Sequence, residues 1–468
     1  VNTPSGYAFL EHRYGTWARV YAGVGFMAFN LLRLGVVLYV TCIALDEFIP
    51  VHALVEGTRA LCGVEALPGI FDAPIVWMIL FLGIVATLYT MSGGFEAVVW
   101  TDFLQSMLFI FGGAVLLPTI LTHIPGDFFG LKTIFEMAGP IGQNKMSFGS
   151  FEFNFAEKTF WVVIISTLFM DASNYTTRQD LIQRYRAPKN LFHARMAVII
   201  GACTVVPIWI YFNFLGTALW TFYEINPSDV VETFRNSQPE KIVPFFMANN
   251  LPMGLKGLFL AAILAASLST MAPMLNACTV TWVDDFYHRF IVRNKSDKHY
   301  MNVGRISTGL IGVLMITSAT LIYTTRSQTL QNLQTTFAMV CSIGLFGLFM
   351  IGFFAKGVGN RSAKYAACVV VPVGLFWTVA YIIKTSPELP SSLATRFFNP
   401  EGGASLAELV SKFEGWQLAF GQWIPDIFWM VVFMNLLMIG CALGFAAILP
   451  KEKVDIDNLF PENSADKP

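Results

Sequence analysis

The stretch LPMGLKGLFLAAILAASLSTMAPMLNACTVTWVDDFY, from Leu251 to Tyr287, contains the apolar segment Leu258–Val283. That segment is long enough to cross the roughly 30 Å of hydrocarbon in a bilayer. Nine further apolar segments lie along the chain: Val20–Ile43, Pro74–Tyr89, Ala97–Leu121, Phe160–Tyr175, Met196–Phe222, Val303–Tyr323, Leu333–Phe354, Ala366–Ile383 and Ile424–Leu449. The sequence therefore predicts an all-α, polytopic membrane protein with ten membrane helices.

The composition of the chain agrees with this class and argues against several others. Of its 468 residues, 55% are hydrophobic and only 13% are charged, and the net charge is −1. There is no basic domain, so we expect no nucleic-acid partner. The seven cysteines show no CxxC spacing, and the sequence contains no HExxH, GxSxG or GxxxxGK[ST] motif. We therefore expect neither an enzyme nor an organic cofactor.

Basic residues are concentrated in alternate connections between the apolar segments. Arg184–Arg195 and Arg289–Lys298 are examples, whereas the intervening connections His123–Lys158 and Lys384–Asp426 are longer and richer in acid. Because short cytoplasmic loops carry an excess of lysine and arginine, the first set is predicted to be cytoplasmic. The polar tail 451–468 would lie on the same side. We expect an integral protein of the cell membrane, inner or plasma, with a cytoplasmic C-terminus.

Three segments resemble the sodium:solute symporter family. They are LYTMSGGFEAVVWTDFLQ (Leu88–Gln105), NYTTRQDLIQRYRAPKN (Asn174–Asn190) and the stretch Leu251–Tyr287, and they occur in the family's order. The chain opens at Val1 with no initiator methionine or signal peptide, so we expect an upstream segment. The resemblance implies that the first two core helices of the family are absent from this sequence.

The resemblance also implies a fold. Members of the family have ten core helices in two inverted five-helix repeats, with ion and substrate sites at broken helices near the midplane. On that pattern Val20–Ile43 is the third core helix and Leu333–Phe354 the tenth. We expect one transmembrane domain over residues 1–450, with an N-terminally incomplete core at 18–354 and two further membrane helices within 364–450.

A candidate sodium half-site lies in the middle of Leu258–Val283. Ala266, Ser269 and Thr270 are spaced i, i+3, i+4 and share one helix face, and the resemblance implies that they are the family's sodium motif. Hydroxyl and carbonyl oxygens suit a hard cation. Pro273 has no N–H, so the Ser269 carbonyl lacks its usual helical partner. The alternative is that both hydroxyls simply bond to the preceding turn or to a neighbouring helix.

Asp102 is the candidate for a second sodium ion. The resemblance implies that some relatives bind such an ion with this aspartate and with hydroxyls further along the sodium-motif helix. The matching positions here, Ala272 and Pro273, have no side-chain oxygen. We therefore predict one sodium per substrate. Asp102 would then hold helices together through hydrogen bonds with Gln105 or Thr101.

Arg33 interrupts the apolar run Val20–Ile43 in the string RLGVVLY. An arginine at the centre of a membrane helix costs about 2.5–3.5 kcal/mol on insertion scales, so it is expected to bind something. One alternative is a structural ion pair with Asp171 or Asp102. The string is most similar to the sialic acid transporter branch, which implies that Arg33 pairs with a substrate carboxylate through its planar fork. Asp171 and Asn174 are further candidates for substrate binding.

The segment YTTRQDLIQRY is predicted to form part of the cytoplasmic gate. Gln179 and Asp180 would cap or pair there, Arg178 would extend its head towards the membrane interface, and Arg184 would be a cytoplasmic anchor residue.

The sequence thus predicts a sodium-coupled symporter, acting as a monomer in the lipid bilayer, that imports a small organic anion by alternating access. The substrate would be a sialic acid or a related sugar acid, with a short monocarboxylate or a neutral sugar as alternatives. A sensor that has lost transport is the other alternative, although only a short polar tail follows the last span where an appended signalling domain would be expected.

Overall fold

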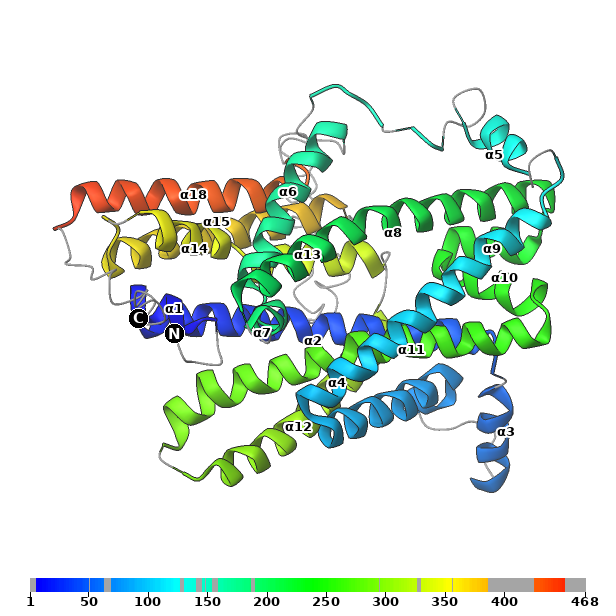
Figure 1. Cartoon of the computed structure of the whole chain (residues 1–468), viewed down its shortest axis with the longest axis horizontal. Helices are drawn as coiled ribbons and strands as arrows, with labels where there is room; N and C mark the ends of the chain where they lie inside the picture. The colour runs from blue at the N-terminus through cyan, green and yellow to red at the C-terminus, as the bar shows by residue number, and fades with distance from the viewer. Residues whose placement is uncertain are drawn as a thin grey trace, which may run out of the picture. The chain divides into compact units, whose positions relative to one another are not determined.

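The structure is a computed structural model, which describes residues 6–49, 51–62, 69–126, 130–139, 145–147, 149–153, 159–186, 190–293, 295–325, 330–355, 357–385 and 425–450. Throughout these residues the regular structure is helical (Figure 1). The elements are α1 (Ala8–Tyr14), α2 (Thr16–Asp46), α3 (Val51–Cys62), η1 (Gly69–Asp72), α4 (Pro74–Thr122), α5 (Leu131–Ala138), α6 (Phe160–Thr177), α7 (Gln179–Arg186), α8 (Leu191–Ile225), α9 (Asp229–Ser237), η2 (Pro239–Lys241), α10 (Ile242–Asn250), α11 (Met253–Val280), the π-helix η3 (Thr281–Ile291), α12 (Asp297–Thr325), α13 (Leu330–Cys341), α14 (Leu345–Phe354), α15 (Asn360–Thr385) and α18 (Phe428–Ile448). The predicted tail 451–468 lies outside the described residues.

The membrane helices largely match the ten that the sequence predicts. Within the described residues, eight helical stretches are long and apolar enough to cross a membrane. Two of them, Pro74–Ser92 and Trp100–Thr122, belong to α4. A ninth span is formed if α13 and α14, which meet at a bend of 41°, are counted together. The remaining predicted segment forms α6, which is not among these spans because its C-terminal half is polar.

The chain is divided into two compact units, each assembled from separated segments. Unit 1 comprises residues 1–29, 148–182 and 331–468, and unit 2 comprises residues 30–147 and 183–330. The chain passes between the units four times, inside α2, between α5 and α6, inside α7 and at the first residue of α13.

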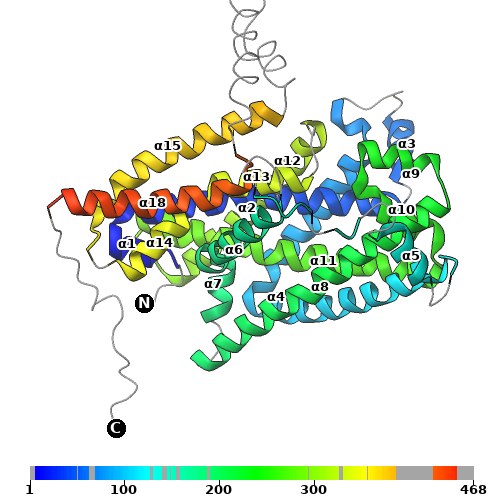
Figure 2. The same ribbon diagram turned by 90° about the horizontal axis from the view of Figure 1, so that it is seen from above.

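Unit 2 is held together by close helix packing around α4. In this unit α11 and α12 pack along α4, and both views show these helices side by side (Figures 1 and 2). Small residues permit the close approach: a Cβ added at Gly312 of α12 would lie 2.2 Å from Oγ1 of Thr87 on α4. The hydroxyls of Thr41 on α2 and Ser267 on α11 lie 2.5 Å apart. Such small-residue contacts and hydroxyl bonds are how membrane helices associate without a hydrophobic driving force between them.

Unit 1 contains a broken helix. Between α13 and α14 the backbone turns at Gly344, whose φ of +65° favours glycine. The N–H of Gly347 donates to Oδ1 of Asn435 on α18 at 2.8 Å, and Asn435 Nδ2 donates to the carbonyl of Val431 at 2.6 Å. Backbone groups at such a break must be satisfied inside the protein, since lipid offers no partners. In both views α18 lies beside α15 (Figures 1 and 2).

Candidate functional site

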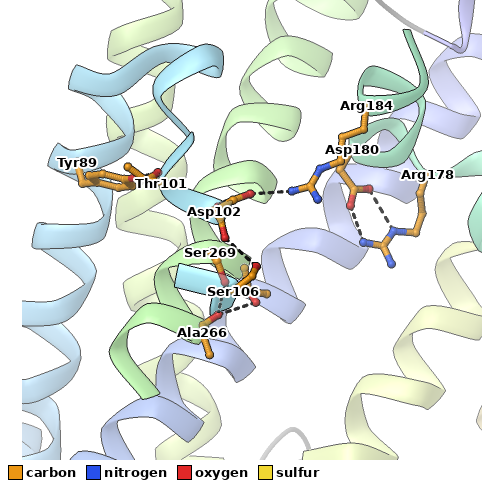
Figure 3. Close-up of polar contacts among 10 residues, drawn as sticks. Tyr89, Thr101, Asp102, Ser106, Arg178, Asp180, Arg184, Ala266 and Ser269 are labelled. Atoms are coloured by element: carbon orange, nitrogen blue, oxygen red, sulfur yellow. Dashed lines mark hydrogen bonds and ion pairs between the residues drawn. The ribbon is translucent and has the colours of Figure 1, made fainter. Parts of the chain in front are cut away.

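The predicted sodium half-site forms a compact group of oxygens on α11. Ser269 Oγ and Thr270 Oγ1 each donate to the carbonyl of Ala266, both at 2.9 Å (Figure 3). All three residues are half-buried. The three oxygens therefore converge on one helix face, while the hydroxyl hydrogens point at the carbonyl as the back-bonding alternative expects. A bound cation would need these hydroxyls to rotate, so that their oxygens and the carbonyl face the ion.

The position of this oxygen group along the membrane span is favourable for ion coupling. The span formed by α11 and η3 runs over 39 residues from Met253 to Ile291, and Ser269 lies near its middle. Pro273 stands inside α11, which remains helical through it. Because proline has no N–H, the carbonyl of Ser269 has no helical donor at this depth. The half-site thus combines hydroxyls with a carbonyl that lacks its usual helical hydrogen bond, near the centre of the span.

Asp102 has a partner that the sequence did not predict. Its Oδ2 accepts a hydrogen bond from Arg184 Nη2 at 2.9 Å, and the two side chains form an ion pair (Figure 3). The other carboxylate oxygen, Oδ1, is buried and accepts no hydrogen bond from the described residues. The expectation that Asp102 bonds with Gln105 or Thr101 is therefore wrong, as is an ion pair between Asp102 and Arg33. Arg184 prevails because a buried carboxylate gains more from a guanidinium than from neutral donors.

The segment predicted to form part of the cytoplasmic gate differs from the prediction at Arg178. Arg178 does not extend towards the interface: its Nε and Nη2 donate to the two carboxylate oxygens of Asp180 at 3.1 and 2.5 Å (Figure 3). Both side chains are mostly buried. Arg178 caps the end of α6 with an extended backbone, with ψ of 120°, which allows its side chain to reach residue 180. Gln179 is fully buried, and its Oε1 accepts from the N–H of Gly6 at 2.9 Å.

The candidate substrate residues belong to different units of the chain. Arg33 lies on the part of α2 that belongs to unit 2 and is half-buried, beside the close contact of Gly35 with Ser318. Asp171 and Asn174 lie on α6 in unit 1, where Asp171 is exposed and Asn174 half-buried.

Two polar contacts beside the half-site escaped the sequence reasoning. Arg184 was interpreted as an anchor residue, yet it is the counter-charge of Asp102. Thr41 joins α2 to α11 through Ser267, two residues before Ser269. A signal for the first existed: an acid within an apolar run requires a cation. No signal identified Thr41, because a threonine in a membrane helix usually bonds its own helix, as Thr41 also does with the Val37 carbonyl.

Comparison with known families decides the broader class. The sodium:solute symporter family matches residues 62–369 of this chain, well over half of its length. The chain belongs to the sodium:solute symporter family. This confirms the resemblance that the three sequence segments indicated, as well as the prediction of an all-α, polytopic integral membrane protein.

Several relatives carry names that describe sodium-coupled transport. The chain is 27% identical over 364 residues to the sodium/sialic acid symporter NanT of Aliivibrio fischeri, covering 78% of this chain and 66% of that protein. It is 26% identical over 367 residues to the sodium/sialic acid symporter SiaT of Proteus mirabilis, covering 78% and 68%. Against the human sodium-coupled monocarboxylate transporter 1 it is 28% identical over 380 residues, covering 79% and 57%. The chain thus spans about two thirds or less of the length of these relatives, all of which are transporters and not enzymes.

A solved structure supports the same fold. A Na⁺-coupled sialic acid symporter, described in its substrate-bound outward-open state, superposes with a TM-score of 0.71 over 96% of this chain and 78% of that one. The two sequences are 22% identical, so this likeness shows the fold alone. The predicted similarity to the sialic acid branch is confirmed by NanT and SiaT.

Proposed function

We propose that this protein is a sodium-coupled symporter that imports a small organic anion, a sialic acid or a related sugar acid, by alternating access. The observation that carries the proposal is the oxygen group of Ala266, Ser269 and Thr270 near the middle of a membrane span. The protein's membership of the sodium:solute symporter family supports sodium as the coupling ion.

Sodium binding at this group needs no formal negative charge. Two hydroxyl oxygens and one carbonyl oxygen already lie within hydrogen-bonding distance of one another, so little reorganisation is required beyond rotation of the hydroxyls. Neutral oxygen ligands are inexpensive to keep in a membrane compared with a carboxylate. When the ion leaves, the hydroxyls return to the Ala266 carbonyl, and no buried donor is left unsatisfied.

Arg33 is the proposed anchor for the substrate carboxylate, with Asp171 and Asn174 contributing polar contacts. The guanidinium of arginine matches a carboxylate with two parallel hydrogen bonds, which orient as well as attract the ligand. A short monocarboxylate would offer the same group, and the relationship to a monocarboxylate transporter supports that second candidate. A neutral sugar would have no charge to pair with the guanidinium of Arg33 and is therefore disfavoured.

The remaining assignments follow from sequence and local geometry. Gln179 and Asp180, paired with Gly6 and Arg178, are proposed to belong to the cytoplasmic gate. The alternation of basic connections supports a cytoplasmic C-terminus in the inner or plasma membrane. We propose that the protein acts as a monomer, with the bilayer and the small-molecule substrate as its partners.

The test is uptake into vesicles reconstituted with the purified protein. Labelled sialic acid, lactate and glucose would be compared under an inward sodium gradient and under an equal potassium gradient. We expect sodium-dependent accumulation of the sialic acid, weaker accumulation of lactate and none of glucose. Binding of sialic acid without uptake would favour a sensor on the same scaffold, and sodium-dependent glucose uptake would contradict the role of Arg33.

A further inference from the structure

The ion pair between Asp102 and Arg184 places a guanidinium on a carboxylate that lies inside a membrane span. Asp102 lies in the span Trp100–Thr122 of α4, and Arg184 lies on α7. Arg184 Nη2 and Asp102 Oδ2 are 2.9 Å apart, and the side chain of Asp102 is 16% exposed against 48% for Arg184. The carboxylate is therefore the buried partner. The arginine reaches it from a more exposed position and supplies its positive charge.

Two buried oxygens at this ion pair are not explained by it. Asp102 Oδ1 and Gln105 Oε1 are both buried, and neither accepts a hydrogen bond from the described residues. The two residues are three positions apart on α4 and so lie on neighbouring turns of one face. Buried acceptors of this kind are rare in folded proteins. Together with Asp102 Oδ2 they form an oxygen-rich group with one negative charge. Arg184 donates to only one of these oxygens, Asp102 Oδ2.

This oxygen-rich group faces the sodium half-site on α11. Leu116 and Ile120, towards the C-terminal end of α4, share a core with Phe259 near the N-terminal end of α11. One turn earlier on α4, a Cβ added at Gly112 would lie 3.1 Å from the Cβ of Ala262 on α11. The two helices therefore run antiparallel, and residues before Gly112 face residues after Ala262.

The same register brings the two sets of oxygens to one level. Gln105 is two helical turns before Gly112, and Ser269 is two turns after Ala262, so they lie opposite one another. Asp102, one turn further, is opposite Ala272. Because Ala272 has no side-chain oxygen, the residue of α11 directly opposite the carboxylate offers no side-chain ligand for a cation.

We propose that the guanidinium of Arg184 takes the place of a second sodium ion at Asp102. Transport then requires a single sodium. The inference rests on the proposed function and deepens it. With the guanidinium on Asp102, only the group around Ser269 takes up sodium. One sodium and one monoanion then cross together, their charges cancel, and the membrane voltage makes no contribution to accumulation.

Arg184→Gln tests the proposal in reconstituted vesicles. Without the guanidinium, the free carboxylate and the unsatisfied Oε1 of Gln105 should recruit a second sodium. The Hill coefficient for sodium should rise from about one towards about two, and uptake should begin to carry inward current. Arg184→Lys retains a positive charge and should stay electrically silent. Arg195→Gln, which removes an exposed arginine from α8, is the matched control and should also stay silent.

A double variant guards against the case in which Arg184→Gln is inactive because a buried charge is left unpaired. Asp102→Asn combined with Arg184→Gln removes both charges and should restore uptake with a Hill coefficient of about one. Failure to restore uptake would overturn the proposal. So would an active Arg184→Gln variant that keeps the wild-type sodium dependence, or a wild-type protein that already carries current.

Direct binding of radioactive sodium to the purified protein separates this inference from the proposed function. Arg184→Gln should bind about twice as much sodium as the wild type, and the double variant should return to the wild-type amount. If wild-type protein binds sodium but imports none of the tested anions, the proposed function fails while this comparison still decides the role of Arg184. Equal binding by wild type and Arg184→Gln would overturn the role of Arg184.

Discussion

The half-site on α11 and the ion pair of Asp102 show two different ways to keep polar atoms inside a membrane. Ser269 and Thr270 bond a carbonyl of their own helix, so the group is satisfied without any other segment. Asp102 depends on Arg184, which is 82 positions away in the chain. A neutral site can therefore be emptied and refilled without cost to the fold, whereas a charged one requires a permanent partner.

The strongest test of this comparison is the double variant Ser269→Ala, Thr270→Ala. If the hydroxyls serve ion binding and not folding, sodium-stimulated uptake should be abolished while the thermal unfolding of the detergent-solubilised protein is unchanged. The control is Thr204→Ala, Thr217→Ala on α8, which removes two hydroxyls that also bond only their own helix. Normal sodium dependence of the first variant would show that the half-site assignment is wrong.

Arg33 extends the comparison to a charge whose partner is proposed to be the substrate. Arg33→Ala should lose about 2–5 kcal/mol of substrate affinity, as for other truncated buried charge pairs, which is roughly 30- to 4000-fold in the dissociation constant. Arg33→Lys should also bind more weakly, because a point charge cannot reproduce the fork. Substrate binding by the purified protein gives both values.

The alternative role of Arg33 is an ion pair with Asp171, and a second variant separates the two. If Arg33→Ala combined with Asp171→Ala restored transport, Arg33 would be a structural residue. If the substrate carboxylate is the partner, the double variant should remain as defective as Arg33→Ala.

Asn435 provides a neutral contact that, unlike those of Ser269 and Thr270, crosses from one helix to another. Asn435→Ala leaves the buried N–H of Gly347 without an acceptor, which should cost about 1–3 kcal/mol of stability. Asn213→Ala is the matched control, since its side chain bonds only the Trp209 carbonyl of its own helix. A lower unfolding temperature for the first variant alone would support the distinction, and equal unfolding temperatures would contradict it.

Thr41 should give the smallest effect. Thr41→Ala removes the bond to Ser267, but Ser267 keeps its bond to the Ile263 carbonyl, so no donor is orphaned. We expect a loss of about 0.5–1 kcal/mol, in the range measured for hydrogen bonds between membrane helices. Thr90→Ala on α4, a buried threonine bonded only to the Ala86 carbonyl, should lose less. A larger loss of stability for Thr90→Ala would show that a hydroxyl bonded to another helix stabilises this protein no more than one bonded to its own helix.

The positions of the membrane helices could be predicted from sequence because apolar length is a local property of the chain. The segment that became α6 is the informative exception. Asp171, Ser173 and Asn174 occupy its C-terminal half, so it forms a helix but lacks the uniform apolar character of the other spans. The break between α13 and α14 was not predicted, and Leu333–Phe354 was expected to form one helix, because nothing in its residues except Gly344 indicates where the helix bends.

The partners of charged residues were much harder to predict. The distance in sequence between Asp102 and Arg184 leaves no local pattern to detect. Arg178 and Asp180 are only two positions apart, yet residues at that spacing do not meet on a helix. They meet here because Arg178 has an extended backbone between α6 and α7. Amino-acid composition does not reveal where such a break between two helices falls.

The contact between Asn435 and the broken helix also bears on how far this protein can be shortened. The resemblance places α18 outside the ten-helix core, as an addition that a minimal transporter could lack. Yet Asn435 supplies the acceptor for Gly347, and a Cβ added at Gly347 would lie 2.7 Å from the carbonyl oxygen of Asn435, so the two helices touch backbone to backbone. A chain truncated before α18 would expose that surface and its N–H to lipid, so the helix is a structural part of unit 1 and not a removable extension.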